Sequence, residues 1–330
     1  MSIPPTMRAI AIQNGALVEA ALPTPELKAG EVLIHVAYAG VNRADQLQRE
    51  GKYSPPPGAS PLPGLEVSGR IAAKAKDVRN FTAGDPVCAL LSGGGYAEYV
   101  AAPADQVLLT PPKMGLREAA SLPEAGATSM MALFVEGRLK QGERVLIHGG
   151  TSGVGLLMAQ IAKRAGAEVF ATVGGVEKCG FLKRFGIIPI DHTAAPFHEQ
   201  VLVQTGHEGV DLVIDTLGGP QFENHLRVLR PGGRLVTLAM LEGSTLPDGA
   251  KMTRLLMNHL RWSGATLRSR STAEKAVLLE ELKARCWRQF AEGAISPAID
   301  SVFPLVEAEK ALARMQERLH MGKILLEVAP

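Results

Sequence analysis

The chain has 330 residues and a formal charge of +2, and hydrophobic side chains make up 46% of it. This length and composition suit a globular protein with two domains, and the small charge gives no reason to expect nucleic acid or a membrane as a partner. The N-terminus lacks the apolar core of a signal peptide, and no apolar run approaches the ~20 residues of a membrane span. The three cysteines lie far apart. We therefore expect a cytoplasmic protein without disulfides.

The first 120 residues are rich in glycine, proline and short runs of β-forming residues. Four of these runs are predicted to be strands of an antiparallel, barrel-like β domain. The predicted strands are 31–37, 66–72, 85–91 and 96–100.

From about residue 124 to residue 268, helical and strand patterns alternate, which predicts a parallel sheet covered by helices. The predicted strands are 145–147, 168–173, 211–216, 234–240 and 265–268, with a turn at 229–233. The fold class is therefore α/β, with a doubly wound parallel sheet of the Rossmann kind following a β-barrel domain.

A glycine-rich turn between the first two of these strands is the most informative feature. Apolar residues precede it and then recur at helical spacing from Val154 to Ala162. In such a β-α-β unit, the turn and the helix N-terminus bind the pyrophosphate of a dinucleotide. The turn consists of Gly150, Thr151, Ser152, Gly153, Val154 and Gly155.

Two glycines of this turn have expected roles: Gly150 should turn the chain sharply out of the strand, and Gly155 should let helix and strand pack closely. Ser152 replaces the middle glycine of the G-x-G-x-x-G fingerprint, so the match is imperfect. A tight turn without a ligand is the alternative. The strand before the turn and the helix and strand after it favour nucleotide binding.

The end of the second strand indicates which dinucleotide binds. An NAD site usually places Asp or Glu there to hold the ribose hydroxyl, and this chain has none. Gly174, Gly175 and Lys178 instead leave room and positive charge for a 2′-phosphate, which favours NADPH over NADH. Glu177 opposes this interpretation if it faces the phosphate, whereas a solvated first-turn residue would not.

The last 60 residues read as a long helix, 272–292, and a short αβ segment. Two strands, 298–303 and 323–328, flank a helix at 306–319. This segment is too short for a domain of its own. We expect it to return to the first domain, which would then be discontinuous.

With these features, the chain resembles the zinc-free quinone oxidoreductase branch of the medium-chain dehydrogenase/reductase superfamily, near the NADPH quinone oxidoreductases of the p53-inducible type. The segments that carry the resemblance are 40–45, 63–69, 93–99, 149–155 and 322–327, with longer local matches at 42–60 and 267–270.

The resemblance implies two domains with the cofactor NADPH in the cleft between them. A GroES-like catalytic domain would comprise 1–123 and 269–330, and a Rossmann domain 124–268. It also implies a homodimer formed through the edge strand of the Rossmann sheet, near 265–269, because pairing removes an open edge.

No metal site is predicted. Asn42 stands where zinc-dependent relatives have their first cysteine ligand, and Gly64-Leu65-Glu66 replaces their Gly-His-Glu. Without zinc, the acceptor itself must carry the charge delivered with a hydride, as a quinone or a conjugated enone does.

The resemblance and this chemistry together suggest individual site residues. Asn42 and Tyr53 are the expected hydrogen-bond donors of the catalytic site, with Asp45 capping the nearby helix. Thr128 should lie near the nicotinamide, and Lys323 should face the cleft. The remaining cofactor contacts are His192 at the 2′-phosphate, and Leu217, Met240 and Leu241 beside the adenine and nicotinamide.

Simpler interpretations exist for several of these residues. They are a turn-forming asparagine at 42, a half-buried tyrosine at 53, helix packing at 128, an exposed loop histidine at 192 and a solvated lysine at 323. The leading hypothesis is nonetheless NADPH-dependent, metal-independent reduction of quinones. An alkenal or enone double-bond reductase is the nearest alternative, and an NADPH-binding sensor or structural protein with little turnover is an alternative of another class.

Overall fold

The structure is a computed structural model that describes residues 3–329. The chain divides into two compact units. Unit 1 contains the chain up to Ala127 and again from Leu267 onward, and unit 2 is the continuous segment Thr128–Thr266. The polypeptide therefore leaves unit 1 once, forms unit 2 and returns.

Unit 2 is built on a six-stranded, fully parallel sheet with the strand order β10-β9-β8-β11-β12-β13. The strands are β8 (Arg144–Ile147), β9 (Glu168–Val173), β10 (Ile188–Asp191), β11 (Val210–Asp215), β12 (Leu229–Thr237) and β13 (Arg261–Gly264). This arrangement confirms the predicted α/β fold with a doubly wound sheet.

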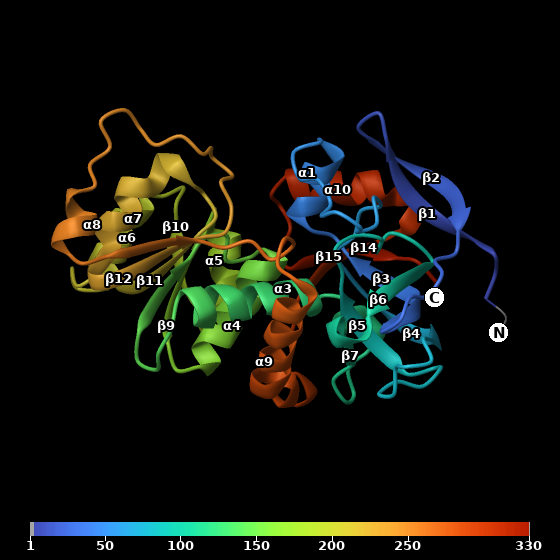
Figure 1. The fold of residues 1–330 in the computed structure, drawn as a ribbon. Helices are drawn as coiled ribbons and strands as arrows, with labels where there is room; N and C mark the ends of the chain where they lie inside the picture. The colour runs from blue at the N-terminus through green and yellow to red at the C-terminus, as the bar shows by residue number, and fades with distance from the viewer. Residues whose placement is uncertain (1–2, 330) are drawn as a thin grey trace. The chain divides into compact units, whose positions relative to one another are not determined.

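Helices cover both faces of this sheet (Figure 1). On one face lie α4 (Gly153–Arg164) and α5 (Val176–Lys183); on the other lie α6 (Phe197–Gln204), α7 (Phe222–Val228) and α8 (Thr253–Met257). Both faces of the central strands are thus covered, which explains why Val145, Leu146 and Ile147 are all buried. Strand order reverses between β8 and β11, the place where open α/β sheets bind ligands.

Two predicted segments of unit 2 were wrong. The edge strand is Arg261–Gly264, which pairs with β12, and residues 265–268 are not a strand. Arg268 is instead drawn away by hydrogen bonds to Ser92 and Gln48 of unit 1. The strand expected at 234–240 runs instead from Leu229 to Thr237 and includes the predicted turn as an irregular stretch.

Unit 1 has a seven-stranded sheet in the order β14-β15-β3-β4-β5-β7, with β6 pairing β3, and a separate β1-β2 hairpin. The sequence did not predict the hairpin. The strands are β1 (Thr6–Gln13), β2 (Ala16–Pro23), β3 (Glu31–Gly40), β4 (Glu66–Lys74), β5 (Pro86–Leu90), β6 (Tyr99–Pro103), β7 (Val107–Leu109), β14 (Ile299–Pro304) and β15 (Lys323–Glu327).

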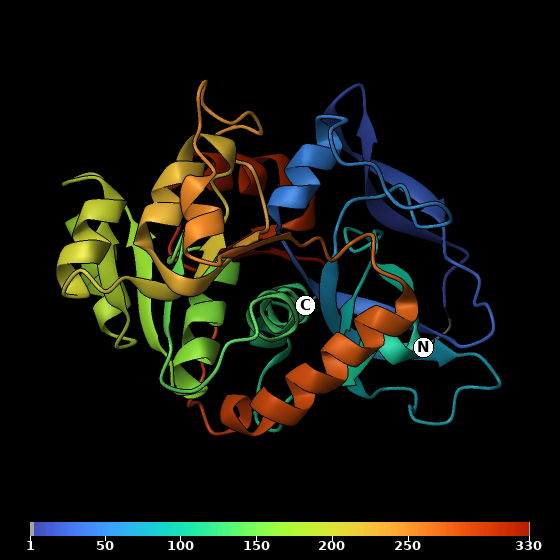
Figure 2. The same cartoon turned by 60° about the vertical axis from the view of Figure 1, so that its left-hand side comes forward.

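The C-terminal segment completes the sheet of unit 1. Strand β15 pairs antiparallel with β3, so that Leu325 lies opposite Gly40. The long helix α9 (Thr272–Ala291) belongs to the same unit and is visible in both ribbon views (Figures 1 and 2). It begins with a capping box between Ser271 and Glu274.

Shorter helices make up the rest of the described chain. In unit 1 these are α1 (Arg43–Arg49), η1 (Ala104–Gln106), α2 (Leu116–Ala119), η4 (Leu305–Glu307) and α10 (Ala308–Gln316). Helix α3 (Pro123–Ser129) and the π-helical η2 (Met130–Glu136) lead into unit 2, which also contains η3 (Gly219–Gln221).

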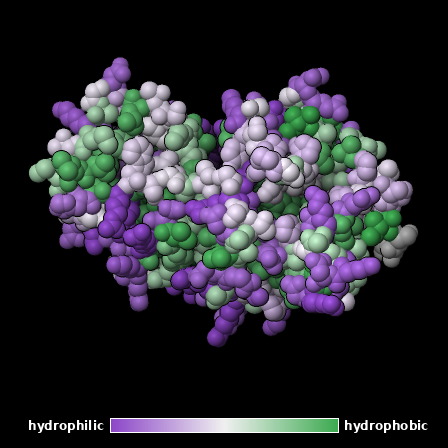
Figure 3. Space-filling model, in the orientation of Figure 1, coloured by the Kyte–Doolittle hydropathy of each residue, from purple (hydrophilic) through white to green (hydrophobic). Residues whose placement is uncertain are grey.

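Apolar side chains on the face shown in Figure 3 form small scattered groups. Across residues 3–329, we find no helix with the length and apolar character to cross a membrane.

Candidate functional site

The glycine turn of unit 2 follows β8 directly. The residue that turns the chain is Gly149, with φ +72°, a backbone conformation that favours glycine. The expectation that Gly150 performs this turn was therefore wrong. Gly150 is constrained instead by β9, because a Cβ atom at this position would lie 2.6 Å from the Cβ of Ala171.

Ser152 takes the place of the fingerprint's middle glycine without filling the turn. Its hydroxyl caps α4, accepting from the amide of Gly155 at 3.0 Å and donating to the carbonyl of Gly149 at 2.8 Å. A methyl group on Gly155 would overlap that carbonyl oxygen, which explains why Gly155 has no side chain. The amides of Gly153 and Val154 have no partner in the described chain, and they begin a twelve-residue helix. This cradle fits a pyrophosphate.

The four residues predicted to lie at the 2′-phosphate are found around the end of β9. Gly175 has φ +91° and donates its amide to Asp191 Oδ1 at 3.0 Å. The ring of His192 lies against Gly174, since a Cβ on that glycine would be 3.4 Å from His192 Nε2. Lys178 is half-buried in the first turn of α5, and Glu177 is exposed.

Asp191 is an anion at this position that the sequence did not suggest. Its Oδ1 accepts from the amide of Gly175 and from the amide and hydroxyl of Thr193. These hydrogen bonds, the one from Gly175 first, lower the pKa of Asp191. The carboxylate therefore stabilises the Gly174–Gly175 turn, and it also places a negative charge beside it.

The predicted residues Leu217, Met240 and Leu241 lie in the loops that follow β11 and β12. Backbone hydrogen bonds join these loops, from Leu241 to Thr216 at 3.0 Å and from Glu242 to Leu217 at 2.9 Å. The side chains of Met240 and Leu241 are 53% and 39% exposed. All three residues therefore sit at the carboxyl edge of the sheet, the same edge as the glycine turn.

A buried histidine pair supports this edge. His148, which directly follows β8, lies 3.1 Å from Thr172 through Nδ1 and 3.1 Å from His225 through Nε2. Burial lowers the pKa of both imidazoles, so a neutral pair shares one N–H···N hydrogen bond. The pair ties β8 to α7 beneath the turn. The predicted residue Thr128 lies on α3 and is half-buried.

Unit 1 contains a second cluster, which we call the polar centre: Asn42, Glu66, Glu124 and Lys323. The ammonium group of Lys323 forms an ion pair with Glu66 Oε1 and donates to Asn42 Oδ1 at 2.7 Å. Asn42 in turn donates to Glu66 Oε1 at 3.1 Å, and the amide of Glu124 donates to Glu66 Oε2 at 3.0 Å. Asn42, Glu66 and Lys323 are buried, so the interpretation of Lys323 as a solvated lysine was wrong.

These contacts define the role of Asn42 more closely than the sequence did. Its side-chain amide nitrogen donates to Glu66 and to the carbonyl of Gly40 at 3.3 Å, and its oxygen accepts from Lys323. Asn42 therefore positions Lys323 and Glu66. Asp45 caps α1 as expected, accepting from the amide of Asn42 at 2.8 Å and from the hydroxyl of Tyr96 at 3.0 Å.

Tyr53 is held by a cation. The guanidinium of Arg268 lies 5.3 Å from the centre of its ring and donates to its carbonyl at 3.1 Å. Lys275 supports Arg268 by donating to its carbonyl at 2.9 Å. Burial, and then the charge of Glu124, raise the pKa of the Tyr53 phenol.

Glu124 is the residue of this centre that sequence reasoning missed most completely. Its carboxyl forms no hydrogen bond or ion pair within the described chain. Part of the side chain remains accessible to solvent, yet loss of hydration is the largest cause of its shift, followed by repulsion from Glu66, and together they raise the pKa to about 8. The carboxyl is therefore mostly protonated at neutral pH and can act as a proton donor.

The donor set of the polar centre does not suit zinc. Both oxygens of Glu66 are already hydrogen-bonded, and the neighbouring positions are Asn42 and Leu65. Among residues 3–329, no three His, Cys, Asp or Glu side chains come together in a way that could hold a metal ion.

Comparison with protein families agrees with this architecture. The alcohol dehydrogenase GroES-like domain matches residues 28–112, within unit 1. The family described as zinc-binding dehydrogenase matches residues 153–283, which begin at α4 and continue into α9. The description of this family does not by itself give the chain a zinc site, because the donor set of the polar centre does not suit zinc.

Relatives among characterised proteins include quinone oxidoreductase from Sus scrofa, 31% identical over 93% of this chain and 92% of its own length. The synaptic vesicle membrane protein VAT-1 homolog from Rattus norvegicus is 31% identical over 91% of this chain and 78% of its own length. For the VAT-1 homolog of Danio rerio, the chain spans 66% of the relative's length.

Solved structures with the same fold include the CurK enoyl reductase, 28% identical, with a TM-score of 0.85 over 99% of this chain and all of the other. A mycobacterial protein solved in complex with NADPH is also 28% identical, with a TM-score of 0.85 over 98% of this chain and all of the other. The two family matches and the quinone oxidoreductase relative together show that this chain belongs to the medium-chain dehydrogenase/reductase superfamily, whose oxidoreductases use nicotinamide cofactors.

Proposed function

We propose that the protein reduces quinones with NADPH and without a metal ion, as a member of the zinc-free quinone oxidoreductase branch. The observation that carries this proposal is the ion pair between Lys323 and Glu66, because a side-chain cation occupies the ligands that a metal would need. An acceptor with its own conjugated system needs hydrogen-bond and proton donors more than it needs a Lewis acid. The polar centre supplies such donors.

The turn of unit 2 would hold the cofactor, with the amides of Gly153 and Val154 at the pyrophosphate. When bound, the reduced nicotinamide supplies a hydride. The lack of a carboxylate at the end of β9, together with His192 and Lys178, favours NADPH, as does the NADPH complex of the mycobacterial relative. Asp191 and Glu177 act against a 2′-phosphate, so the preference over NADH should be moderate.

Unit 1 would supply the proton. Reduction of a quinone adds one hydride to the acceptor and one proton to the oxygen, which yields a hydroquinone and the oxidised cofactor. We assign this proton to the carboxyl of Glu124, which is recharged from water through its accessible surface. Tyr53, fixed by Arg268, would orient the acceptor through its phenol.

The experiment is NADPH oxidation by the purified protein with 1,2-naphthoquinone, before and after treatment with EDTA and 1,10-phenanthroline. We expect turnover that chelators leave unchanged. Loss of activity when the chelators remove a metal ion would contradict the proposal. Glu124→Gln should lower kcat and remove the fall in rate expected as pH rises through about 8, where the wild-type carboxyl loses its proton.

Reduction of an enone double bond is the second candidate, favoured by the similarity to the CurK enoyl reductase. It uses the same hydride and a related acceptor. The kcat/KM values for 1,2-naphthoquinone and for a 2-alkenal, measured side by side, decide between them. Tight NADPH binding with no turnover of either acceptor would instead indicate a sensor or a structural protein.

The preference for NADPH has its own test in Lys178→Ala. Loss of this charge should raise KM for NADPH much more than KM for NADH, because only NADPH carries the 2′-phosphate. Equal changes for both cofactors would place the phosphate elsewhere.

We also propose a homodimer formed through β13. This strand ends the sheet of unit 2 and, within residues 3–329, has hydrogen-bonding groups that no neighbouring strand uses. Sedimentation at micromolar concentration should give twice the chain mass of 35.0 kDa. A monomer would overturn this part of the proposal without affecting the catalytic part.

A further inference from the structure

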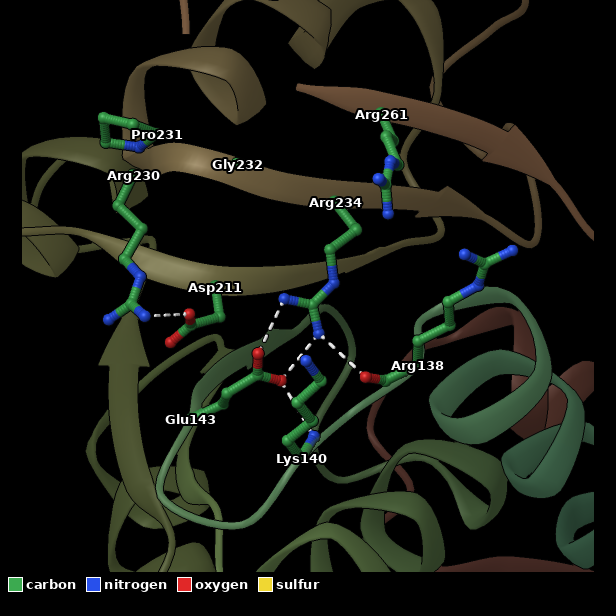
Figure 4. A pocket seen from close by; sticks show the side chains of 9 residues that line it. All are labelled: Arg138, Lys140, Glu143, Asp211, Arg230, Pro231, Gly232, Arg234 and Arg261. Atoms are coloured by element: carbon green, nitrogen blue, oxygen red, sulfur yellow. Dashed lines mark hydrogen bonds and ion pairs between the residues drawn. The ribbon is translucent and has the colours of Figure 1, made fainter. Parts of the chain in front are cut away.

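A basic pocket lies at the amino edge of the sheet in unit 2 (Figure 4). Its volume is about 310 Å³, and its walls are the loop that precedes β8 and the first residues of β11, β12 and β13. In a parallel sheet these strand starts all share one edge, and the glycine turn follows the opposite ends of the strands. The pocket is therefore separate from the proposed nucleotide cradle.

The floor of the pocket is a rigid ion-pair system. Arg234 forms two hydrogen bonds with Glu143, at 2.6 and 2.9 Å, and both side chains are mostly buried. Arg234 also donates to the carbonyl of Gly137 at 2.8 Å, which fixes the loop. On one side, Arg230 forms an ion pair with Asp211 at 2.6 Å. The two acidic residues of the pocket are thus already neutralised.

Three further cations line the pocket without a side-chain ion pair in the described chain: Arg138, Lys140 and Arg261. Five basic and two acidic side chains leave a net charge of three positive units. Arg261 and Arg234 are register partners on neighbouring strands, so their side chains leave the sheet on the same face. Figure 4 shows Arg261 and Arg138 extending into the same space beside Arg234.

We propose that this pocket binds a small polyvalent phosphate through Arg138, Lys140 and Arg261. Guanidinium groups match phosphate oxygens in pairs, and the net charge of three positive units balances the charge of a diphosphate. The lining contains no aromatic side chain on which a base could stack, and Pro231 is its only apolar member apart from Gly232. A free diphosphate or the phosphate end of a metabolite therefore suits the pocket better than a nucleoside.

A bound anion would connect the loop before β8 to the edge strand β13. Arg138 belongs to the loop before β8, and Arg261 begins the edge strand β13. Occupancy should therefore stabilise unit 2 against heat, since a ligand that binds only the folded state raises its stability. Edge pairing in a dimer uses the backbone of β13 and leaves the side chain of Arg261 on the face of the sheet.

The test is calorimetry of the full chain with pyrophosphate and, separately, glycerol 3-phosphate at constant ionic strength. We expect one site per chain for pyrophosphate, together with a higher Tm. Arg138→Ala combined with Arg261→Ala should weaken binding roughly ten- to a hundredfold, because charge-assisted hydrogen bonds are lost. Comparable binding of glycerol 3-phosphate would identify a metabolite phosphate as the ligand, and its failure a free diphosphate.

The matched control is Lys76→Ala combined with Arg79→Ala. These exposed cations of unit 1 have no ion pair in the described chain, and their loss changes the net charge by the same amount. The control should bind pyrophosphate as the wild type does. No saturable binding, an equal loss in the control, or displacement of pyrophosphate by NADPH would each overturn the proposal. Both double variants should keep the NADPH affinity of the wild type.

Discussion

The polar centre of unit 1 and the glycine turn of unit 2 depend on different kinds of contact. In the polar centre, side chains make the contacts: Lys323 and Glu66 neutralise each other away from water, and Asn42 forms a hydrogen bond with each of them. In the turn, the backbone makes the contacts, and Gly150 and Gly155 are needed because a side chain would collide. The polar centre depends on matched charges, and the glycine turn depends on two positions that have no side chain. The two regions should therefore fail in different ways when they are changed.

The largest effect should follow from Lys323→Met, which leaves Glu66 as a buried charge without its cation. Removing one partner of a buried ion pair costs about 3–5 kcal/mol of stability. Urea denaturation would measure the loss. Adding Glu66→Gln should recover part of it, and Arg8→Ala, which breaks an exposed pair with Glu98, should cost only about 0–1 kcal/mol. Equal losses for the buried and exposed pairs would contradict the closed-network interpretation.

In the turn, Gly155→Ala should cost about 1–3 kcal/mol, because the added methyl group overlaps the carbonyl of Gly149. NADPH affinity should fall with it, since the first turn of α4 has to shift. The control is Gly180→Ala in α5, where no atom lies within 4 Å of the added methyl group. That change should be stabilising by roughly 0.5–1 kcal/mol. Unchanged NADPH binding in Gly155→Ala would show that the turn is not the cradle.

A pH-dependent effect should come from Glu124→Gln. The pKa of Glu124 is raised to about 8 in the folded chain from an ordinary 4.5, so the folded state holds a proton that the unfolded state has lost between these values. Wild-type stability should therefore decline across this window relative to the variant. Urea midpoints of both proteins at pH 5, 7 and 9 would show it. Parallel pH curves would mean that the carboxyl is well solvated.

The smallest effect should be that of Ser152→Ala. The hydroxyl caps α4, and loss of an N-cap costs about 1 kcal/mol. Thermal unfolding would measure this loss, and Ser152→Gly should cost less while restoring the fingerprint glycine. A cost well above this value for Ser152→Ala would show that the hydroxyl does more than cap the helix.

The sequence predicts the glycine turn of unit 2 better than the polar centre of unit 1. The turn from Gly150 to Gly155 lies within a single β-α-β unit, so neighbouring residues reveal it. Local patterns also placed β9 at the residues observed, and α9 within one residue. The polar centre joins Asn42 to Lys323 across 281 positions, and only a resemblance pointed to either residue. The shifted pKa of Glu124 depends on burial and on Glu66, which no local pattern reports.

The edge strand shows a different limit. Residues 265–268 alternate as a strand does, but Arg268 finds three hydrogen-bond acceptors in unit 1, and the true edge is Arg261–Gly264. Gly149 was overlooked in favour of Gly150 because the motif specifies where glycines occur and not which of them has a positive φ.

The interrupted course of unit 1 has a consequence for synthesis on the ribosome. Asn42, Glu66 and Glu124 are made before the whole of unit 2, and Lys323 is made after it. Chains emerge from the ribosome N-terminus first, and domains fold as units. Unit 2 can therefore complete its sheet before Lys323, the ion-pair partner of Glu66, has been synthesised. The emerging chain should thus acquire its nucleotide cradle first, and its proton-donating centre only when the final strand docks.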